Sequence, residues 1–181
     1  MNLLKIIVIA LLVCSCSAKD SSVDIYKSQK VTQNKMTNSA SSQPKPAFSW
    51  VTPKNWNEST GNSIRLASFS LPAKVGSAEV SLIILSGQAG GLVPNINRWR
   101  GQVGLDQATD VKIKSEVTSI KTKIGIFKYK FIKNNTNSKA IMAAILKKTT
   151  STLFVKATGH LKDLAAQEKT FLKFIEGISE N

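Results

Sequence analysis

The chain has 181 residues, of which 42% are hydrophobic and 20% are charged, and this length fits one domain of modest size. His160 is the only histidine, which excludes a metal site that needs several histidine ligands. The formal net charge of +14 comes from 25 basic residues against 11 acidic ones. It indicates either an anionic partner or a lysine-rich composition that only keeps the protein soluble.

The first 15 residues have the pattern of an export signal. Lys5 gives a short basic start, residues 6–13 carry no charge, and small residues follow. The apolar run is well under the ~20 residues that a membrane-spanning helix needs. The tetrapeptide VCSC, which ends at Cys16, resembles the lipobox of bacterial lipoproteins, with cleavage after Ser15. The resemblance implies that Cys16 becomes the N-terminus and carries the lipid; Cys14 fits less well, because a bulky valine would precede the cut.

Acylation of Cys16 would leave the exported chain without a free thiol or a disulfide, because Cys14 leaves with the signal peptide 1–15. This excludes thiol catalysis and cysteine-ligated metals, and an exported, tethered protein rarely meets nucleic acid. We expect a lipid anchor in the cell membrane or outer membrane, facing the periplasm or exterior, and no cofactor. By the same resemblance, Ser17 favours the outer membrane where a cell has two. The alternative is an ordinary signal, cut near Ala18, that releases a soluble protein.

Residues 16–47 have the composition of a flexible polar linker. They are rich in Ser, Lys, Asn, Gln and Thr, and their sparse apolar residues follow no period, so they cannot bury a core. A flexible linker of about 30 residues has a root-mean-square reach of ~30 Å. Such a linker would hold the following domain, 48–181, just clear of a membrane surface.

Two strands and a helix are expected in the first half of the domain. Residues 64–71 alternate imperfectly between the two faces, and residues 80–85 form the run VSLIIL of a strand covered on both faces. A helix is expected over 94–103, because Pro94 suits its first position and Gly104 suits its C-terminal stop. Its apolar residues lie at helical spacing on one stripe: Ile96, Trp99 and Val103.

The second half predicts strands over 116–121, 124–133, 139–148 and 153–158, closed by a helix over 161–178. Lysines alternate with aromatic residues in 124–133, which is the period of a strand. Leucine, phenylalanine and isoleucine recur at helical spacing in 161–178. Consecutive strands without intervening helices favour an antiparallel sheet, so we expect an α+β domain with helices packed on an antiparallel β-sheet.

The early extended segment with Trp50, Pro53 and Trp56, and the ending LFVKATG followed by QEKTFLKFIEGI, resemble the Mog1/PsbP-like sandwich fold. The resemblance covers residues 48–181. It implies a small, non-catalytic accessory protein.

The helix over 94–103 carries the most distinctive polar residues of the chain. Two of the three arginines flank a tryptophan there, and arginine offers a planar fork that binds carboxylate or phosphate. The candidate binding residues are Asn95, Asn97, Arg98, Trp99, Arg100 and Gln102. The alternative is structural: the tryptophan is core, and Arg98 or Arg100 ties the helix to the sheet through Glu79 or Asp106.

A lysine-rich strand face is the second candidate surface. It comprises Lys121, Lys123, Lys128, Lys130 and Lys133, with Lys112 and Lys114 shortly before them. Such a face would bind anionic lipid or an acidic polymer. The alternative is a solvated edge whose charges discourage edge-to-edge aggregation.

Catalytic patterns are poor, because the acidic residues are scattered and no G-x-S-x-G motif surrounds a serine. The sequence therefore favours a membrane-anchored bacterial lipoprotein that acts as a non-catalytic binding or accessory module in the cell envelope, with an envelope protein or an anionic lipid or polymer as partner. One alternative is a small envelope hydrolase or ligand carrier with a cleft around Trp99, Arg100 and His160. Another is a structural basic lipoprotein that coats an anionic surface.

Overall fold

The computed structural model describes residues 47–62 and 64–181. The expected signal peptide 1–15, the expected lipidation site Cys16 and the linker up to residue 46 lie outside these residues. The described strands are β1 (Phe48–Ser49), β2 (Asn57–Thr60), β3 (Arg65–Leu71), β4 (Ala78–Ser86), β5 (Thr118–Thr122), β6 (Gly125–Lys133), β7 (Lys139–Lys147), β8 (Ser151–His160) and β9 (Ser179–Glu180). The described helices are α1 (Leu92–Gln102), α2 (Asp110–Glu116) and α3 (Leu161–Glu176).

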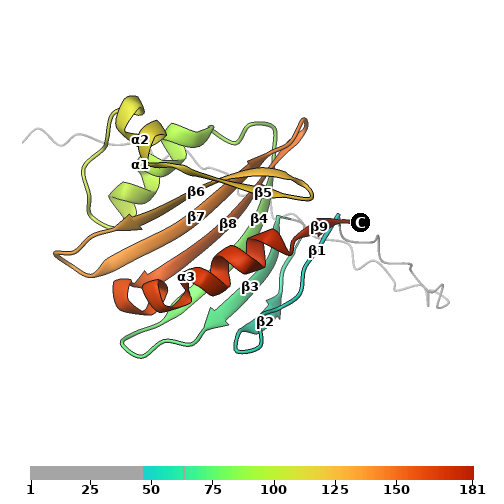
Figure 1. Cartoon of the computed structure of the whole chain (residues 1–181), viewed down its shortest axis with the longest axis horizontal. Coiled ribbons are helices and arrows are strands. Elements are labelled where there is room, and N and C mark those ends of the chain that lie inside the picture. Colours follow the sequence, from blue (N-terminus) through green and yellow to red (C-terminus); the bar gives the residue numbers. More distant parts are fainter. Residues whose placement is uncertain (1–46, 63) are drawn as a thin grey trace, which may run out of the picture. The chain divides into compact units, whose positions relative to one another are not determined.

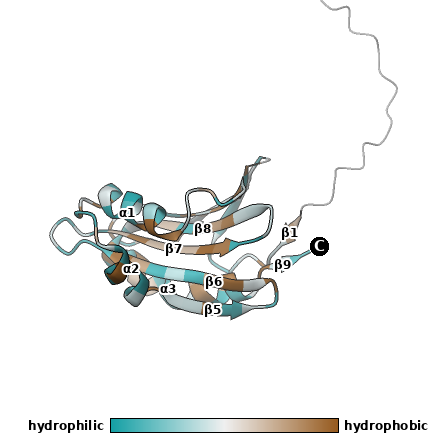
Figure 2. Ribbon diagram, turned by 90° about the horizontal axis from the view of Figure 1, so that it is seen from above, coloured by the Kyte–Doolittle hydropathy of each residue, from teal (hydrophilic) through white to brown (hydrophobic). Residues whose placement is uncertain are grey.

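Seven strands form one antiparallel sheet in the order β2-β3-β4-β8-β7-β6-β5 (Figure 1). β8 lies at the centre and pairs with β4 on one side and with β7 on the other. β4 and β8 are therefore neighbours in the sheet, although α1, α2 and β5 to β7 separate them along the chain. β7 is hydrophobic over most of its length (Figure 2), as expected of a strand covered on both faces, and β8 is buried over residues 152–155.

A separate two-stranded ribbon joins the first and last described segments. β1 pairs with β9 through Phe48↔Glu180 and Ser49↔Ser179. The amide of Asn181 also donates to the carbonyl of Ala47 at 3.2 Å.

Helix α3 covers one face of the sheet and forms the larger core with it (Figure 1). Phe69 of β3 and Phe171 of α3 are fully buried, and the ring of Phe174 lies 5.1 Å from that of Phe69. The ring of Trp56 lies 5.2 Å from that of Phe174. Burial of each such side chain contributes about 1.5–3 kcal/mol, so this aromatic cluster fixes α3 on the sheet.

Helices α1 and α2 cover part of the other face. Their apolar side chains pack on residues of β6, β7 and β8 in a second core: Ile96, Trp99, Val103, Ile113, Ile132, Ile141, Ala143, Ile145 and Phe154. β3 contributes no residue to this second core, so its side of this sheet face lies beside the helices rather than beneath them.

The predicted α+β class, with an antiparallel sheet and packed helices, is confirmed. The helix expected over 94–103 is α1, and it begins two residues earlier, at Leu92. Pro94 is tolerated there because amides of the first turn have no intrahelical acceptor. The predicted stop at Gly104 is confirmed, since its φ of 79° is the left-handed conformation that ends helices.

The strand predicted over 116–121 is wrong at its start, because Glu116 belongs to the short helix α2. The hydroxyl of Thr109 caps this helix by accepting from the amide of Lys112. Of its seven residues only Ile113 is buried, so the sequence shows no apolar stripe. The closing helix ends at Glu176, two residues before the predicted end at 178. The short strands β1, β2 and β9 likewise lack a hydrophobic pattern, and the sequence does not predict them.

Candidate functional site

The inner side of α1 builds the fold. Trp99 is 3% exposed, and its ring meets that of Phe154 edge-to-face at 6.2 Å, so it lies in the second core. Asn95 is 2% exposed, and its amide donates to the carbonyls of Ala89 and Gly91 at 2.8 and 2.5 Å. These bonds close the loop that precedes the helix.

The flank of α1 that faces α2 fastens the loop after the helix. Asn97 exchanges two hydrogen bonds with the backbone of Ala108, at 3.0 and 2.8 Å. The Nε of Arg100 donates to the carbonyl of Asp106 at 2.7 Å. The bond joins Arg100 to the backbone of Asp106 in the loop after α1, so it does not tie the helix to the sheet as the structural alternative predicts.

The opposite flank of α1 presents Arg98 and Gln102, and both are exposed. Arg98 donates to Oδ1 of Asn95 at 2.5 Å, which holds its guanidinium near the helix. Gln102 and Thr158 of β8 line one surface cavity of ≈ 270 Å³. Of the six candidate residues on this helix, these two therefore reach a surface beside the sheet.

The predicted lysine face is divided between the two sides of the sheet. The alternation of strand residues places three lysines on the side of α1 and α2: Lys121, Lys128 and Lys130. Lys133 lies on the other side, where its Nζ is 4.2 Å from the centre of the Phe131 ring. Lys123 lies in the turn between β5 and β6, and Lys112 and Lys114 lie on α2.

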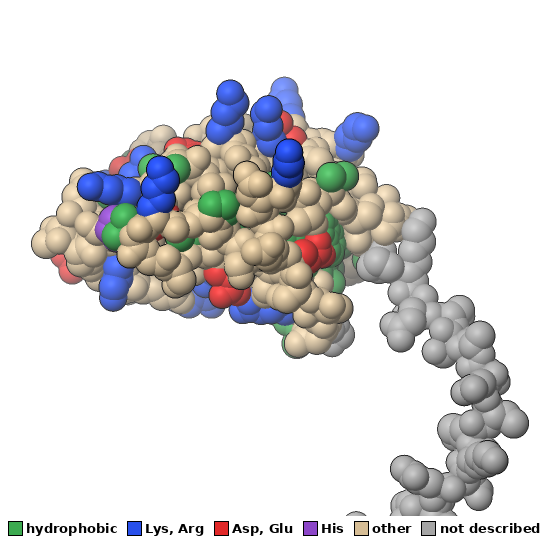
Figure 3. Space-filling view, turned by 90° about the horizontal axis from the view of Figure 1, so that it is seen from below, with side chains coloured by type: hydrophobic (Ala, Val, Ile, Leu, Met, Phe, Trp, Pro, Cys, Tyr) green, Lys and Arg blue, Asp and Glu red, His purple; other side chains and the backbone are tan. Residues whose placement is uncertain are grey.

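Three of these lysines form hydrogen bonds or ion pairs within the fold, and Lys114 does so with Asp110 on the same helix at 3.4 Å. Lys130 forms an ion pair with Glu116 at 2.9 Å, and this hydrogen bond lowers the pKa of the Glu116 carboxyl. The Nζ of Lys128 donates to the hydroxyl of Ser119 at 2.9 Å. Lys and Arg side chains also spread over the face shown in Figure 3, with acidic side chains between them. The net charge is therefore not concentrated in the predicted patch.

A polar strip lies beside α1, on the same face of the sheet, over β3, β4 and β8. Register pairs Ser68 with Ser81 and Ser81 with Lys156, so these residues form one row across the strands. Arg65 donates to Ser68 and forms an ion pair with Glu79, both at 2.8 Å. We call this set, with the exposed flank of α1, the open strip: Arg65, Ser68, Glu79, Ser81, Lys156 and Thr158, with Arg98 and Gln102.

Lys156 is the central cation of the open strip. It is half-buried, and burial lowers the pKa of its ammonium group, with further lowering by the nearby charges of Arg98 and Arg65. Glu79 opposes this by raising the pKa of Lys156, but the carboxylate of Glu79 is already engaged by Arg65. Within residues 47–62 and 64–181, the ammonium of Lys156 has neither a hydrogen bond nor an ion pair.

Such an arrangement favours an anion. A carboxylate or phosphate group would supply Lys156 with its missing acceptor and would offset the repulsion among three cations. Arg98 and Arg65 offer further guanidinium donors, and the hydroxyls of Ser68 and Thr158 can donate as well. The serine and threonine residues beside α1 have small side chains, which leave room for a ligand. A second cavity of ≈ 420 Å³ is lined by Ser70, Glu79 and Thr158.

Sequence reasoning missed the open strip, although one signal was present. Lys156 interrupts the apolar run LFVKAT, and a charged residue inside a central strand is rarely buried without a partner. Its neighbours come from β3, β4 and α1, so only the sheet order brings them together.

The cleft proposed around Trp99, Arg100 and His160 is not assembled. Trp99 is core, and Arg100 binds the backbone of Asp106. His160 caps α3, where its Nδ1 accepts from the amide of Lys162 at 3.2 Å. Each of the three side chains therefore has a separate structural role.

Within the described part of the chain, no group of three or more His, Cys, Asp or Glu residues could hold a metal ion. None of the helices described there is long and apolar enough to cross a membrane.

Comparisons with known proteins give structural likeness without a family. No family model matches the chain, and the search of curated proteins finds no match either. A crystal structure from Bacteroides thetaiotaomicron VPI-5482 is 14% identical with a TM-score of 0.43; the match covers 75% of this chain and 45% of that one, so the chain spans less than half of it. The solution structure of cyanobacterial PsbP (CyanoP) from Synechocystis sp. PCC 6803 is 7% identical with a TM-score of 0.47, over 75% of this chain and 87% of that one. At these scores neither likeness carries an argument, and the Mog1/PsbP-like resemblance stays a prediction.

Proposed function

We propose that this protein is a lipid-anchored, non-catalytic binding module of the bacterial cell envelope, and that its open strip binds a carboxylate or phosphate group of an envelope partner. Cys16 carries the anchor, and residues 16–47 connect it to the domain. The observation that carries the binding role is Lys156, which is half-buried near two arginines and makes no hydrogen bond or ion pair within the described residues.

The anchor is supported by the sequence VCSC at the end of the apolar run. Several buried acyl chains hold a protein durably in a bilayer, because each methylene contributes ~0.8 kcal/mol. The described domain has two cores of its own, which suits a module that folds at the end of a linker.

Metabolic labelling with a clickable fatty acid tests the anchor. We expect label on the wild-type chain, and we expect Cys16→Ala to lose both the label and membrane retention. Cys14→Ala serves as the matched control and should keep both. Membrane retention of the Cys16→Ala chain without label would refute the anchor.

Titration with inorganic phosphate, followed by the amide resonances of an isotope-labelled chain, tests the open strip. We expect saturable shifts in β8 and on the Arg98 flank of α1. A hydrogen bond to a charged group is worth about 1.5–3 kcal/mol, so Lys156→Gln should weaken the binding about 10- to 100-fold. Lys169→Gln, which removes an exposed lysine of α3, is the control and should change the affinity less than twofold. Equal weakening by both variants would show diffuse charge attraction and would refute a built site.

A further inference from the structure

One end of the domain gathers several turns and both described termini. The β5–β6 turn and the β7–β8 turn lie at this end, together with the end of β4 and the β1–β9 ribbon (Figure 1). Lys148 fastens them, because its Nζ contacts the carbonyl of Ile124 and the carboxylate of Glu180, both at 2.9 Å. We call this region the turn end.

The turn end combines exposed cations with exposed aliphatic side chains. Lys121, Lys123 and Lys147 are exposed there. Three of the six exposed large hydrophobic residues of the described chain also lie near this end: Ile64 at 56%, Leu85 at 37% and Ile126 at 51%. Aliphatic side chains with lysines around them are the composition that partitions into the headgroup region of a bilayer.

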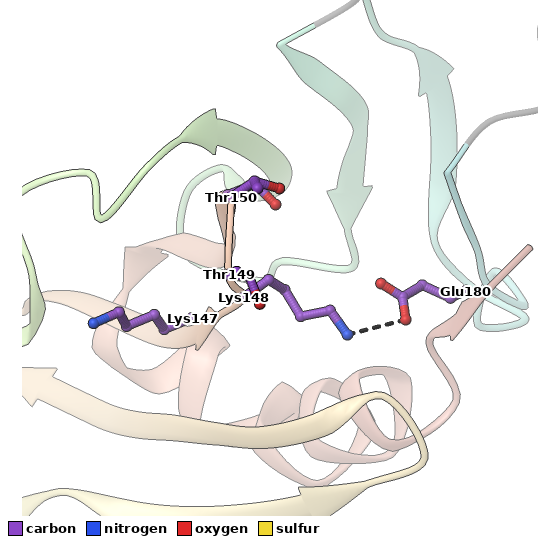
Figure 4. Close-up of a pocket in the computed structure, with 6 residues that line it drawn as sticks. Lys147, Lys148, Thr149, Thr150 and Glu180 are labelled. Carbon is purple, nitrogen blue, oxygen red and sulfur yellow. Dashed lines mark hydrogen bonds and ion pairs between the residues drawn. The ribbon is translucent and has the colours of Figure 1, made fainter.

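A hollow of ≈ 590 Å³ adds to this surface. It is lined by the β7–β8 turn and by Glu180. Figure 4 shows Lys148 directed at Glu180, whereas Lys147 points away from that pair. The acidic residue of the hollow is thus neutralised within the fold, and Lys147 stays available to an outside anion.

The chain enters the domain at the same end. Ala47, the first described residue, pairs with Asn181 beside the β1–β9 ribbon. If Cys16 is acylated, as proposed above, the linker joins the bilayer to this end and to no other part of the domain. The turn at 134–137 and the start of α3 lie at the opposite end of the domain.

From these placements we infer that the turn end docks on an anionic phospholipid bilayer, with Lys123 and Lys147 at the headgroup phosphates and Leu85 and Ile126 at the interface. The inference rests on the proposed anchor for its orientation. The lysines and aliphatic residues themselves need no anchor, so their affinity for a bilayer can be measured apart from it. In the docked orientation the open strip runs along the side of the domain rather than against the membrane, because its row crosses the middle of β4 and β8.

The test uses residues 16–181 with Cys16→Ser, so that no acyl chain contributes. Partitioning is measured by co-sedimentation with vesicles of equal parts phosphatidylglycerol and phosphatidylcholine, and with vesicles of phosphatidylcholine alone. The variant is Lys123→Gln with Lys147→Gln. The control is Lys139→Gln with Lys162→Gln, which removes the same charge from two exposed lysines at the opposite end.

Each lysine near an anionic surface contributes about fivefold in partitioning, so we expect the turn-end pair to lower it about 25-fold. We expect the control pair to change it by less than threefold, and phosphatidylcholine vesicles to bind weakly throughout. Equal losses in the two pairs, or equal binding to both kinds of vesicle, would overturn docking by the turn end. Failure of the anchor is read separately, as absence of a lipid-modified mass on the wild-type chain.

Discussion

Replacement of Lys156 by methionine should make the domain more stable while it weakens anion binding. In the folded state the ammonium group is partly desolvated and faces two arginines, and these effects lower its pKa below 10.5. A like-charge contact of this partly exposed kind is worth about 0.2–1 kcal/mol. Glu79 offsets part of it, so we expect Lys156→Met to raise the free energy of unfolding by about 0.5 kcal/mol.

The pH dependence follows from the same shift. A lysine whose pKa is lowered by folding binds its proton more tightly in the unfolded chain. The stability of the wild type therefore rises with pH between the lowered pKa and 10.5, and this rise should vanish in Lys156→Met.

Urea denaturation of the full chain, with and without phosphate, measures both effects. A ligand at ten times the wild-type dissociation constant stabilises the folded wild type by about 1.4 kcal/mol, and we expect this gain to fall to about 0.4 kcal/mol or less in Lys156→Met. Lys169→Met on the exposed face of α3 is the control and should keep both the wild-type stability and the phosphate gain. A loss of more than about 1 kcal/mol in Lys156→Met would refute the reasoning, because it would mean that the lysine has a stabilising partner.

Three further predictions concern the framework of the site. Phe69→Ala should cost about 3–5 kcal/mol, because it opens a cavity under α3; a loss below 1 kcal/mol in urea denaturation would contradict the packing. Asn134→Ala should cost about 1–3 kcal/mol, because this buried amide donates to the carbonyls of Val103 and Gly104 at 2.9 and 3.1 Å; the shift of the urea midpoint measures it. The ion pair with Lys130 should add stability above the ordinary pKa of Glu116, 4.5, that is lost as pH falls through the lowered value; in Lys130→Met, NMR titration should return the pKa of Glu116 towards 4.5.

The framework of the fold is readable from the sequence where the hydrophobic pattern is strong. The alternation around Tyr129 and the helical spacing before Ile178 predict β6 and α3, because both elements bury one side only. The same alternation separates Lys133 from Lys128 and Lys130, since an odd spacing changes the face of a strand. Helix α2 could not be predicted, because it buries a single side chain.

The candidate site is harder to predict, because its parts meet only through the sheet order. Lys156 stands out in the sequence as a charge within an apolar strand, but its meaning depends on Arg65 of β3 and Arg98 of α1. The hydrogen bonds of Asn97 to Ala108, and of Asn95 to the loop before α1, likewise depend on loop conformations. Residue type therefore marks α1 as distinctive without showing that one flank is structural and the other exposed.

The short ribbon of β1 and β9 also gives the domain a mechanical property. Any pull through the linker reaches the fold at β1, which is held by its pairing with β9, by the bond from Asn181 to Ala47 and by the hydroxyl of Ser49 on Ser179 and Asn181. These bonds would break one after another from the linker end, at a lower force than is needed to shear the strands of the seven-stranded sheet. Each residue released from the fold lengthens the linker by up to about 3.6 Å. The burial of Phe48, and then of Trp56, resists further extension. Tension between the bilayer and a partner would thus first lengthen the connection, while β3, β4, β8 and α1 keep the open strip in place.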